Sequence, residues 1–294
     1  MEEVKVNGCD GGSSLEDSNK DLAYVTKGLE AKAQVIVNDV IINETELTKI
    51  RLLRAFVETQ DPSSKDYSEG VHNRGRFCIA RIEEFEEDDL TIRRFLRARD
   101  LDVEKASTMF LKYLKWRRSF VPNGSITLPE ISNDLADNKV YVQGHNKIGQ
   151  PIILIFGAKH FQRKNGLDEF KRFVVYALDK ICVSMPRGQE KFVSLVELKG
   201  WGYSNSDVRG YINALSILQD YYPERLGKLL ILHAPYIFMR VWKIVNPFID
   251  NKTREKIVFV ESNKLKSTLL EEIDETQLPE IFGGKQQLVP IQDI

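Results

Sequence analysis

Apolar residues recur along this chain with two different spacings, and the point where the spacing changes divides the sequence. From residue 43 to about residue 120 they return every three or four positions, as on one face of an α-helix. Beyond the stretch VPNGS (121–125), short continuous apolar runs alternate with longer helical patterns. Strands that alternate with helices in this way form parallel β-α-β units. The pattern therefore predicts a helical region followed by an α/β region with a mostly parallel sheet.

The first region is predicted to contain three helices, each with its own start signal. Asn43, followed three residues later by Glu46, has the spacing of a capping pair. Asp89 and Asp102 are the expected N-caps of the second and third helices. The stretch 60–76, which contains proline and glycine, is predicted as a loop. The inner faces are expected to carry Leu47, Ile50, Leu53, Phe56, Val57, Ile92, Phe95, Leu96, Ala106, Met109, Phe110, Tyr113 and Trp116.

The second region contains apolar runs of strand length separated by helical patterns. Strands are expected over 139–144, 149–158, 191–198, 228–233 and 256–262. Helices are expected over 167–185, from the N-cap Asp207 onward, and over 236–246. The runs KLLILH and KIVFVE are almost wholly apolar, which is typical of strands in a sheet that helices cover.

The densest apolar block is YIFMRVWKIVNPFI, residues 236–249, in which ten of fourteen residues are apolar or aromatic. As a helix it would be about 21 Å long, against a hydrocarbon core of about 30 Å, so it is too short to span a bilayer. The helix is expected to end near Asn246, because Pro247 follows. Arg240 and Lys243 share one side of it. A helix so apolar on its other sides must be buried or must contact hydrocarbon, and composition alone also allows a plain core helix.

Length and charge narrow the possible functions. The chain has 294 residues, which predicts two domains, and its hydrophobic (42%) and charged (29%) fractions are those of an ordinary globular protein. The formal net charge is −1, so no overall basic field draws the chain to nucleic acid or to an anionic membrane. Any such attraction must come from local groups, and we expect no nucleic-acid partner.

The N-terminal residues 1–42 are expected to form a disordered leader, because they are rich in glycine, serine and charge. VIVNDVII (35–42) is the exception, a strand-prone patch that could dock onto the body. The opening residues lack the features of a secretory signal, and the three cysteines Cys9, Cys78 and Cys182 are too far apart for a metal site. A cytoplasmic location is therefore expected.

Enzyme motifs were sought and not found. The sequence contains no GxGxxG, GxxxxGK[ST], GxSxG or HExxH, and its four histidines are scattered. His233 follows a predicted strand, but no nucleophile lies near it in the sequence, so a structural role is favoured. The acidic run 83–89 is best explained as a solvated helix face. We expect no enzyme activity, no metal and no cofactor apart from a bound ligand.

Five segments occur in an order that carries a resemblance. They are TIRRFLRARDLDVEKASTMFLKYLKWRR (91–118), LKGWGYSNSD (198–207), LQDYYPERLGKLLILHAPYIF (218–238), VNPFIDNKTREKIVFVES (245–262) and LPEIFGGK (278–285). Together they resemble the Sec14 family of phosphatidylinositol transfer proteins, which have a CRAL-TRIO lipid-binding domain after a small helical domain. The resemblance covers about residues 88–285 and implies a lipid-binding domain over 126–285 after a helical domain over 43–122. The leader over 1–42 and the tail over 286–294 match no part of the family pattern.

The resemblance also implies an α/β fold in which a mostly parallel sheet is the floor of an apolar pocket, helices are its walls, and a mobile gate helix closes it. In this chain the gate corresponds to the apolar block described above. Its expected gate residues are Tyr236, Ile237, Phe238, Met239, Val241, Trp242, Ile244, Val245 and Phe248. Such a helix can face acyl chains when closed and hydrocarbon when it opens at a membrane.

Four residues match positions that the family uses around the inositol phosphate, and we call them the headgroup residues: Arg99, Glu224, Thr253 and Lys256. Arg99 could bind two phosphate oxygens through its planar fork, while Lys256 would act as a compact charge. Glu224 could hold Lys256 or accept hydrogen bonds from inositol hydroxyls. An alternative remains open, in which Arg99 and Glu224 serve only as helix-end and hinge ion pairs.

Two departures from the family pattern concern the ligand. Asp100 stands where the family often has lysine, which predicts a weaker or altered headgroup site. Gly202 replaces one hydroxyl residue of the phosphatidylcholine pattern, so the other, Ser204, is only a candidate, together with Tyr176 and Tyr203. The second lipid is left open.

The resemblance implies a soluble monomer that extracts phosphatidylinositol, with or without exchange for a second lipid, and transfers it or presents it to a lipid kinase. Its contact with membranes would be transient and peripheral. Two alternatives are kept. One is a carrier of a non-phosphorylated hydrophobic ligand, similar to tocopherol or a retinoid, on the same fold. The other is an interaction scaffold that uses the acidic run 83–89 and the leader.

Overall fold

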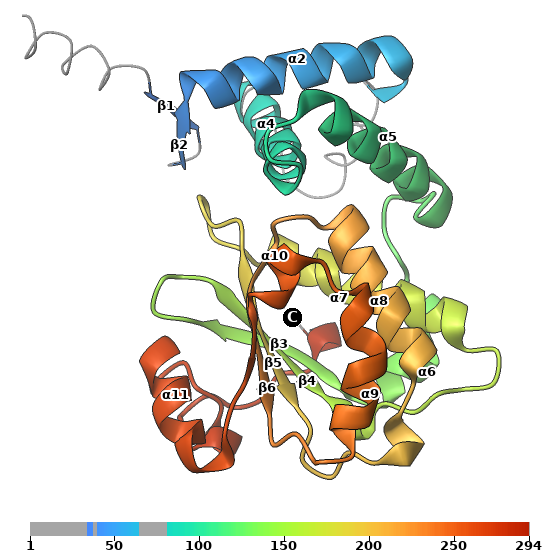
Figure 1. The fold of residues 1–294 in the computed structure, drawn as a ribbon, viewed down its shortest axis with the longest axis vertical. Helices are drawn as coiled ribbons and strands as arrows, with labels where there is room; N and C mark the ends of the chain where they lie inside the picture. Colours follow the sequence, from blue (N-terminus) through green and yellow to red (C-terminus); the bar gives the residue numbers. More distant parts are fainter. Residues whose placement is uncertain (1–33, 38–39, 65–80, 294) are drawn as a thin grey trace, which may run out of the picture.

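The structure is a computed structural model, and it describes residues 34–37, 40–64 and 81–293 (Figure 1). Most of the predicted leader and the greater part of the predicted loop 60–76 lie outside these residues, as do the side chains of 83–88 in the acidic run. The strand-prone patch near the N-terminus forms β1 (Gln34–Val37) and β2 (Val40–Asn43), which pair antiparallel.

Three helices form the first region: α2 (Glu44–Gln60), α4 (Arg81–Ala98) and α5 (Val103–Phe120). Two of their predicted N-caps are confirmed, since Asn43 accepts a hydrogen bond from the Glu46 backbone and Asp102 accepts one from the Lys105 backbone. Their buried faces meet in one apolar cluster that includes Ile50, Leu53, Leu96, Ala106 and Leu114.

Two expectations for this region were wrong. Asp89 does not cap a helix, because α4 begins eight residues earlier, at Arg81. Its carboxylate instead lies 2.5 Å from the guanidinium of Arg54 on α2. Asp89 therefore forms an ion pair between two helices. Phe56, expected on the inner face of α2, is 44% exposed.

The second region is built on a five-stranded sheet whose strands lie in sequence order: β3 (Val140–His145), β4 (Pro151–Phe156), β5 (Phe192–Glu197), β6 (Leu226–Leu232) and β7 (Ile257–Phe259). β3 and β4 are antiparallel and are joined by a tight turn in which Gly149 has a φ of 78°. The other neighbours are parallel. The prediction of a mostly parallel α/β sheet is therefore confirmed.

Helices cover both faces of this sheet (Figure 1). One face is covered by α7 (Leu167–Val183), α8 (Val208–Tyr221) and α9 (Phe238–Val245), and the other by α11 (Leu265–Glu272). Asp207 caps α8 as predicted, through the backbone N–H of Gly210. Two short helices are α6 (Ser132–Ala136) and α10 (Asn251–Arg254). Single 3-10 turns lie at Leu128–Ile131, Gly157–Lys159, Tyr203–Asn205, Asn246–Phe248, Ser262–Lys264, Glu280–Phe282 and Ile291–Asp293.

Side chains of the sheet alternate between the two covered faces. Leu154, Leu195 and Leu230 point to the α11 side and are completely buried there. Ile153, Val196 and Ile231 point to the side of α7, α8 and α9. In the described part of the chain, no helix combines the length and the apolar character needed to cross a bilayer.

Candidate functional site: an apolar cavity beneath α9

A cavity of about 290 Å³ lies between the sheet and the three helices α7, α8 and α9. Its floor is made by alternate side chains of β4, β5 and β6, and almost all of its lining is apolar. Because strand side chains alternate, one face of the sheet supplies this lining while the other face packs against α11. The floor residues are Ile153, Ile155, Ser194, Val196, Leu229 and Ile231.

The helix α9 covers this cavity, which is the position expected for the gate. Phe238, Val241, Trp242 and Val245 point into the cavity at spacings of three, one and three residues. The inner rings also contact neighbours edge to face: Phe238 with Trp201 at 5.2 Å, and Trp242 with Phe259 of β7 at 5.0 Å between ring centroids.

The outer side of the gate is partly apolar as well. Tyr236 (87%), Ile244 (53%) and Phe248 (54%) are exposed, and Ile237 and Met239 are half-buried. The expectation of a helix starting at residue 236 was slightly long, since α9 begins at Phe238. Its end near Asn246, before Pro247, is confirmed, and a 3-10 turn follows there.

Glu224 and Lys256 lie together at the beginning of β6 and β7. The Lys256 Nζ is 3.9 Å from the Glu224 carboxylate, and Lys191 Nζ is 3.6 Å from the same carboxylate. Burial lowers the pKa of Lys256, and the nearby Glu224 opposes that shift. Thr253 lies one turn before Lys256, since its carbonyl accepts the Lys256 backbone N–H at 3.1 Å. Three of the four headgroup residues are therefore neighbours.

Arg99, the fourth headgroup residue, lies at the C-terminal end of α4, and its guanidinium donates to the Ala98 carbonyl at 3.1 Å. Within the described ranges it has no carboxylate partner. Asp100, beside it, accepts a 2.6 Å bond from Lys252 of α10, and Lys252 also donates to the Arg97 carbonyl at 3.0 Å. Through these two bonds, Lys252 joins the end of α4, where Arg99 lies, to α10.

The three second-lipid candidates are not among the residues that line the cavity. Tyr176 is 8% exposed in the core of α7, where burial raises its pKa, and Lys180 lies over its ring at 5.8 Å. Tyr203 is 66% exposed, and its hydroxyl accepts a bond from Arg240 of the gate at 3.3 Å. Ser204 is exposed beside it.

Tyr211 lines the cavity instead, and the sequence analysis did not single it out as a site residue. Its hydroxyl donates to the Asn205 carbonyl and accepts from the Trp201 indole at 3.2 Å. The signal was present in the sequence, because Tyr211 lies one helical turn after the N-cap Asp207 on the buried side of α8.

The strand-end histidine His233 makes a structural contact. Its Nδ1 lies 2.8 Å from the carboxylate of Glu197, which is 6% exposed at the end of β5. Its own backbone has a positive φ of 48°, at the point where the chain leaves β6 for the gate.

Sequence analysis missed a buried polar network at the other end of the cavity. Lys139, 2% exposed, pairs with Asp134, with Asp137 at 3.1 Å and with His160 Nδ1 at 3.2 Å. His160 Nε2 in turn lies 3.2 Å from Asp207. Burial, and then the charge of Lys139, lower the pKa of His160, so the ring is neutral, with Nε2 donating and Nδ1 accepting.

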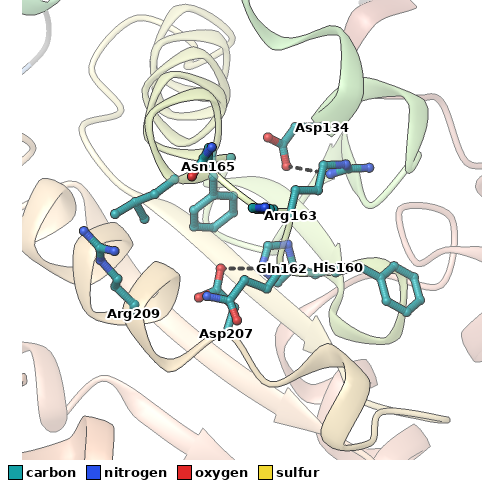
Figure 2. Close-up of a pocket in the computed structure, with 12 residues that line it drawn as sticks. Asp134, His160, Gln162, Arg163, Asn165, Asp207 and Arg209 are labelled. Atoms are coloured by element: carbon teal, nitrogen blue, oxygen red, sulfur yellow. Dashed lines mark hydrogen bonds and ion pairs between the residues drawn. The ribbon is translucent and has the colours of Figure 1, made fainter.

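Three members of this network, Asp134, His160 and Asp207, line a polar pocket of about 330 Å³ (Figure 2). His160 and Phe170 line both the polar pocket and the apolar cavity. The two spaces are therefore neighbours separated by these side chains. No group of His, Cys, Asp and Glu suited to a metal ion occurs in the part of the chain that the structure describes.

The sequence is similar to known proteins over most of the chain. Residues 135–284 match the CRAL/TRIO domain family. The chain is 33% identical over 217 residues to Sec14 cytosolic factor of Schizosaccharomyces pombe, covering 68% of this chain and 76% of that protein. It is 29% identical over 211 residues to the phosphatidylinositol/phosphatidylcholine transfer protein SFH12 of Arabidopsis thaliana, covering 65% of this chain but only 38% of that protein.

The fold was also compared with solved structures. The crystal structure of Sfh5 superposes with a TM-score of 0.60 at 17% identity, covering 76% of this chain and 83% of that chain. At this identity the likeness concerns the fold alone.

Proposed function

The chain belongs to the CRAL/TRIO domain family and is a Sec14-like lipid-binding protein, and from this premise we propose that it carries phosphatidylinositol between membranes. In this proposal it works in the cytoplasm as a monomer, touches membranes transiently, and transfers the lipid or presents it to a lipid kinase. No covalent step is needed, in keeping with a family of lipid-transfer proteins rather than enzymes.

One observation carries the proposal: the apolar cavity beneath α9 has a cationic group at one end. The cavity-lining residues Leu226 and Ile257 are within two residues of Glu224 and Lys256 along the chain. A lipid whose acyl chains lay in the cavity could therefore place its headgroup at the headgroup residues. A phosphodiester at such a partly buried edge needs cationic partners, and Lys256 and Arg99 are the available ones.

The energetics of exchange support a carrier. Each acyl CH₂ moved from water into an apolar site gains about 0.8 kcal/mol, so a pocket can match what the bilayer gives the same chains. Exchange is then nearly balanced once the gate opens. The exposed Tyr236, Ile244 and Phe248, beside Arg240 and Lys243, give the gate a surface that hydrocarbon and anionic headgroups would stabilise in the open state.

A second function on the same fold is favoured by the size of the cavity. At about 290 Å³ it lies near the lower limit of ligand pockets, roughly 300–1,000 Å³. A single small hydrophobic ligand would need less movement of α9 than a lipid with two acyl chains. A carrier of a tocopherol- or retinoid-like molecule is therefore the alternative.

The deciding experiment is a vesicle transfer assay with three fluorescent cargoes: phosphatidylinositol, phosphatidylcholine and a tocopherol analogue. We expect protein-dependent transfer of phosphatidylinositol that anionic acceptor vesicles increase. Mass spectrometry of lipids that co-purify with the chain provides an independent measure. Transfer of the tocopherol analogue alone, with no phospholipid bound, would overturn the proposal in favour of the second function.

A further inference from the structure

The polar pocket lies at the opposite end of the sheet from the headgroup residues. Glu224 and Lys256 precede β6 and β7, whereas His160 and Asp207 follow β4 and β5, and these four strands are parallel. The carboxyl ends of parallel strands are where α/β sheets most often receive ligands. The apolar cavity therefore has polar groups at both ends, and only one end is assigned by the proposed function.

The carboxylates around the polar pocket already have partners. Asp137 receives two bonds from Arg163, at 3.0 and 2.5 Å, and Asp134 lies beside Lys139 and 3.6 Å from Arg163. Asp207 accepts the Gly210 backbone N–H at 2.8 Å and faces His160. Figure 2 shows the pairs Arg163–Asp134 and His160–Asp207 as separate contacts along the wall. These negative charges are compensated from within the protein.

Two cations of the polar pocket remain without such partners. Lys164, in the loop before α7, and Arg209, in the first turn of α8, are both exposed and line the pocket. Within the described ranges, neither side chain has a hydrogen bond or an ion pair. The exposed Asp168 nearby is paired with Lys171 at 2.7 Å, and Arg209 acts on it only through the longer-range Coulomb attraction that also lowers its pKa. The uncompensated charge at the mouth is therefore positive.

From this arrangement we propose that the polar pocket binds a phosphate group through Arg209 and Lys164. Arg209 offers a planar fork for two phosphate oxygens and Lys164 a compact charge, so the pair suits a dianion. The first turn of α7, which lacks a side-chain cap at Gly166, faces the same space and adds a favourable dipole. Asp134, His160 and Asp207, which line the pocket, have partners other than these two cations.

Two kinds of phosphate could bind the polar pocket, a free phosphate and the phosphate of a lipid, because the pocket adjoins the apolar cavity. His160 and Phe170 separate the polar pocket from the apolar cavity, and their ring centroids are 4.7 Å apart. A lipid with a terminal phosphate could bind its head in the pocket if these rings part, with its tail in the cavity. A free phosphate would need no such movement. The inference rests on the proposed function only if the bound phosphate belongs to a lipid.

The test is calorimetric titration of the full chain with two probes, inorganic phosphate and a short-chain phosphatidic acid below its micelle concentration. The variant is Lys164→Gln with Arg209→Gln, and Lys199→Gln, an exposed lysine outside the pocket, is the matched control. We expect the double variant to bind at least about tenfold more weakly, since it loses two charge-assisted contacts, and the control to bind as the parent chain does. Arg209→Lys, which retains the charge, should retain part of the binding.

The two probes distinguish a site for free phosphate from a site for a lipid phosphate. Binding of both supports a site for free phosphate as well as lipid phosphate, and binding of the short-chain lipid alone supports a headgroup site joined to the cavity. Equal affinity of the double variant and the control, or no heat with either probe at millimolar concentration, overturns the proposal. The transfer assay reports on the headgroup residues at the other end of the sheet, whereas weaker binding by the double variant reports on the polar pocket, so failure of phosphatidylinositol transfer does not affect the result.

Discussion

At the scale of single residues, Lys256 is the most direct test of the headgroup assignment. Its ammonium is half-buried beside Glu224, so it is held in place before any ligand arrives. In Lys256→Ala we expect phosphatidylinositol transfer to fall about tenfold to a hundredfold, the effect of one lost charge-assisted contact. Vesicle transfer, compared with Lys199→Ala as control, measures this. Glu224 retains Lys191 as a partner, so the variant should still fold. Transfer at the parental rate would remove Lys256 from the site.

Asp100 gives a prediction of the opposite sign. It holds Lys252 at 2.6 Å and lies next to Arg99, so it reduces the positive charge available at the headgroup end. Asp100→Asn should release Lys252, and Asp100→Lys should add a further charge. We expect binding to phosphatidylinositol vesicles to rise in that order, most clearly at low salt. Co-sedimentation at two salt concentrations measures it. A fall in binding would show that the Asp100–Lys252 contact is needed to position α10.

His160 connects stability to pH. Its folded-state pKa lies below the ordinary value of 6.5, because the ring is buried beside Lys139. Between those two values the unfolded chain binds a proton that the folded chain does not, so stability is complete above about pH 6.5 and falls as the pH decreases. We expect the urea midpoint to drop between pH 7 and pH 5, and to drop less in His160→Gln.

The carboxylates with lowered pKa values, Asp137 and Glu169, also lose stability on acidification, but near and below their ordinary values of 3.8 and 4.5. They therefore act at lower pH than His160 and can be separated from it. Identical pH profiles for His160→Gln and the parent chain between pH 7 and pH 5 would contradict the assignment.

At the scale of elements, one face of α9, the predicted gate helix, lines the cavity and the other face is exposed to solvent. The inner face closes the cavity with Phe238, Val241, Trp242 and Val245. Ile244 of α9, and Phe248 in the 3-10 turn that follows it, are exposed. Ile244→Asp with Phe248→Asp should leave the fold intact, because both positions already face solvent, yet should reduce vesicle transfer severalfold, since the open gate would place charges against hydrocarbon.

The matched control for the gate is Val183→Asp, at the end of α7, where the side chain is 85% exposed and far from α9 in the chain. Circular dichroism checks the fold of both variants, and initial transfer rates compare them. Equal loss in both would show a general effect of added negative charge. If neither variant loses transfer activity, the outer side of α9 and the turn after it do not contact the membrane during transfer.

Local signals explain which elements could be predicted from sequence. Asn43, Asp102 and Asp207 cap their helices as expected, because a cap depends only on the next three residues. Asp89 failed the same test, because its partner Arg54 lies 35 positions away on another helix. Tyr203 and Tyr211 differ for a related reason: which of two nearby tyrosines faces the cavity depends on the 3-10 turn before α8.

In the candidate site too, residues in local sequence segments could be predicted and residues brought together from distant segments could not. Glu224, Thr253 and Lys256 were predicted because they stand in recognisable segments, and their role stays a prediction, but the structure does bring them together. The network of Lys139 and His160 was missed, because its members are spread between residues 134 and 207 and match no local motif. Only the sheet, which places the ends of β4 and β5 side by side, makes them neighbours.

At the scale of the whole molecule, the helical region and the α/β region share a continuous contact along α5. Trp116 stacks on Tyr221 with ring centroids 3.8 Å apart. Arg117 makes two bonds to Asp179, at 3.2 and 2.7 Å, and Tyr222 donates to the same carboxylate at 2.7 Å. Because these contacts join α5 to α7 and α8, the helical region supports the wall of the cavity and the two regions should unfold together.

That coupling can be tested by removing its charged part. Arg117→Ala leaves the Asp179 carboxylate with Tyr222 as its main partner, and breaking a partly buried pair of this kind costs about 1–3 kcal/mol. We expect a lower melting temperature in Arg117→Ala, and with Trp116→Ala added, two separate calorimetric transitions in place of one. Lys115→Ala, an exposed neighbour on α5, is the control. If the double variant still melts in one transition at the parental temperature, the two regions are held together by contacts other than those of Trp116 and Arg117, and the support that α5 gives the cavity wall lies elsewhere along the helix.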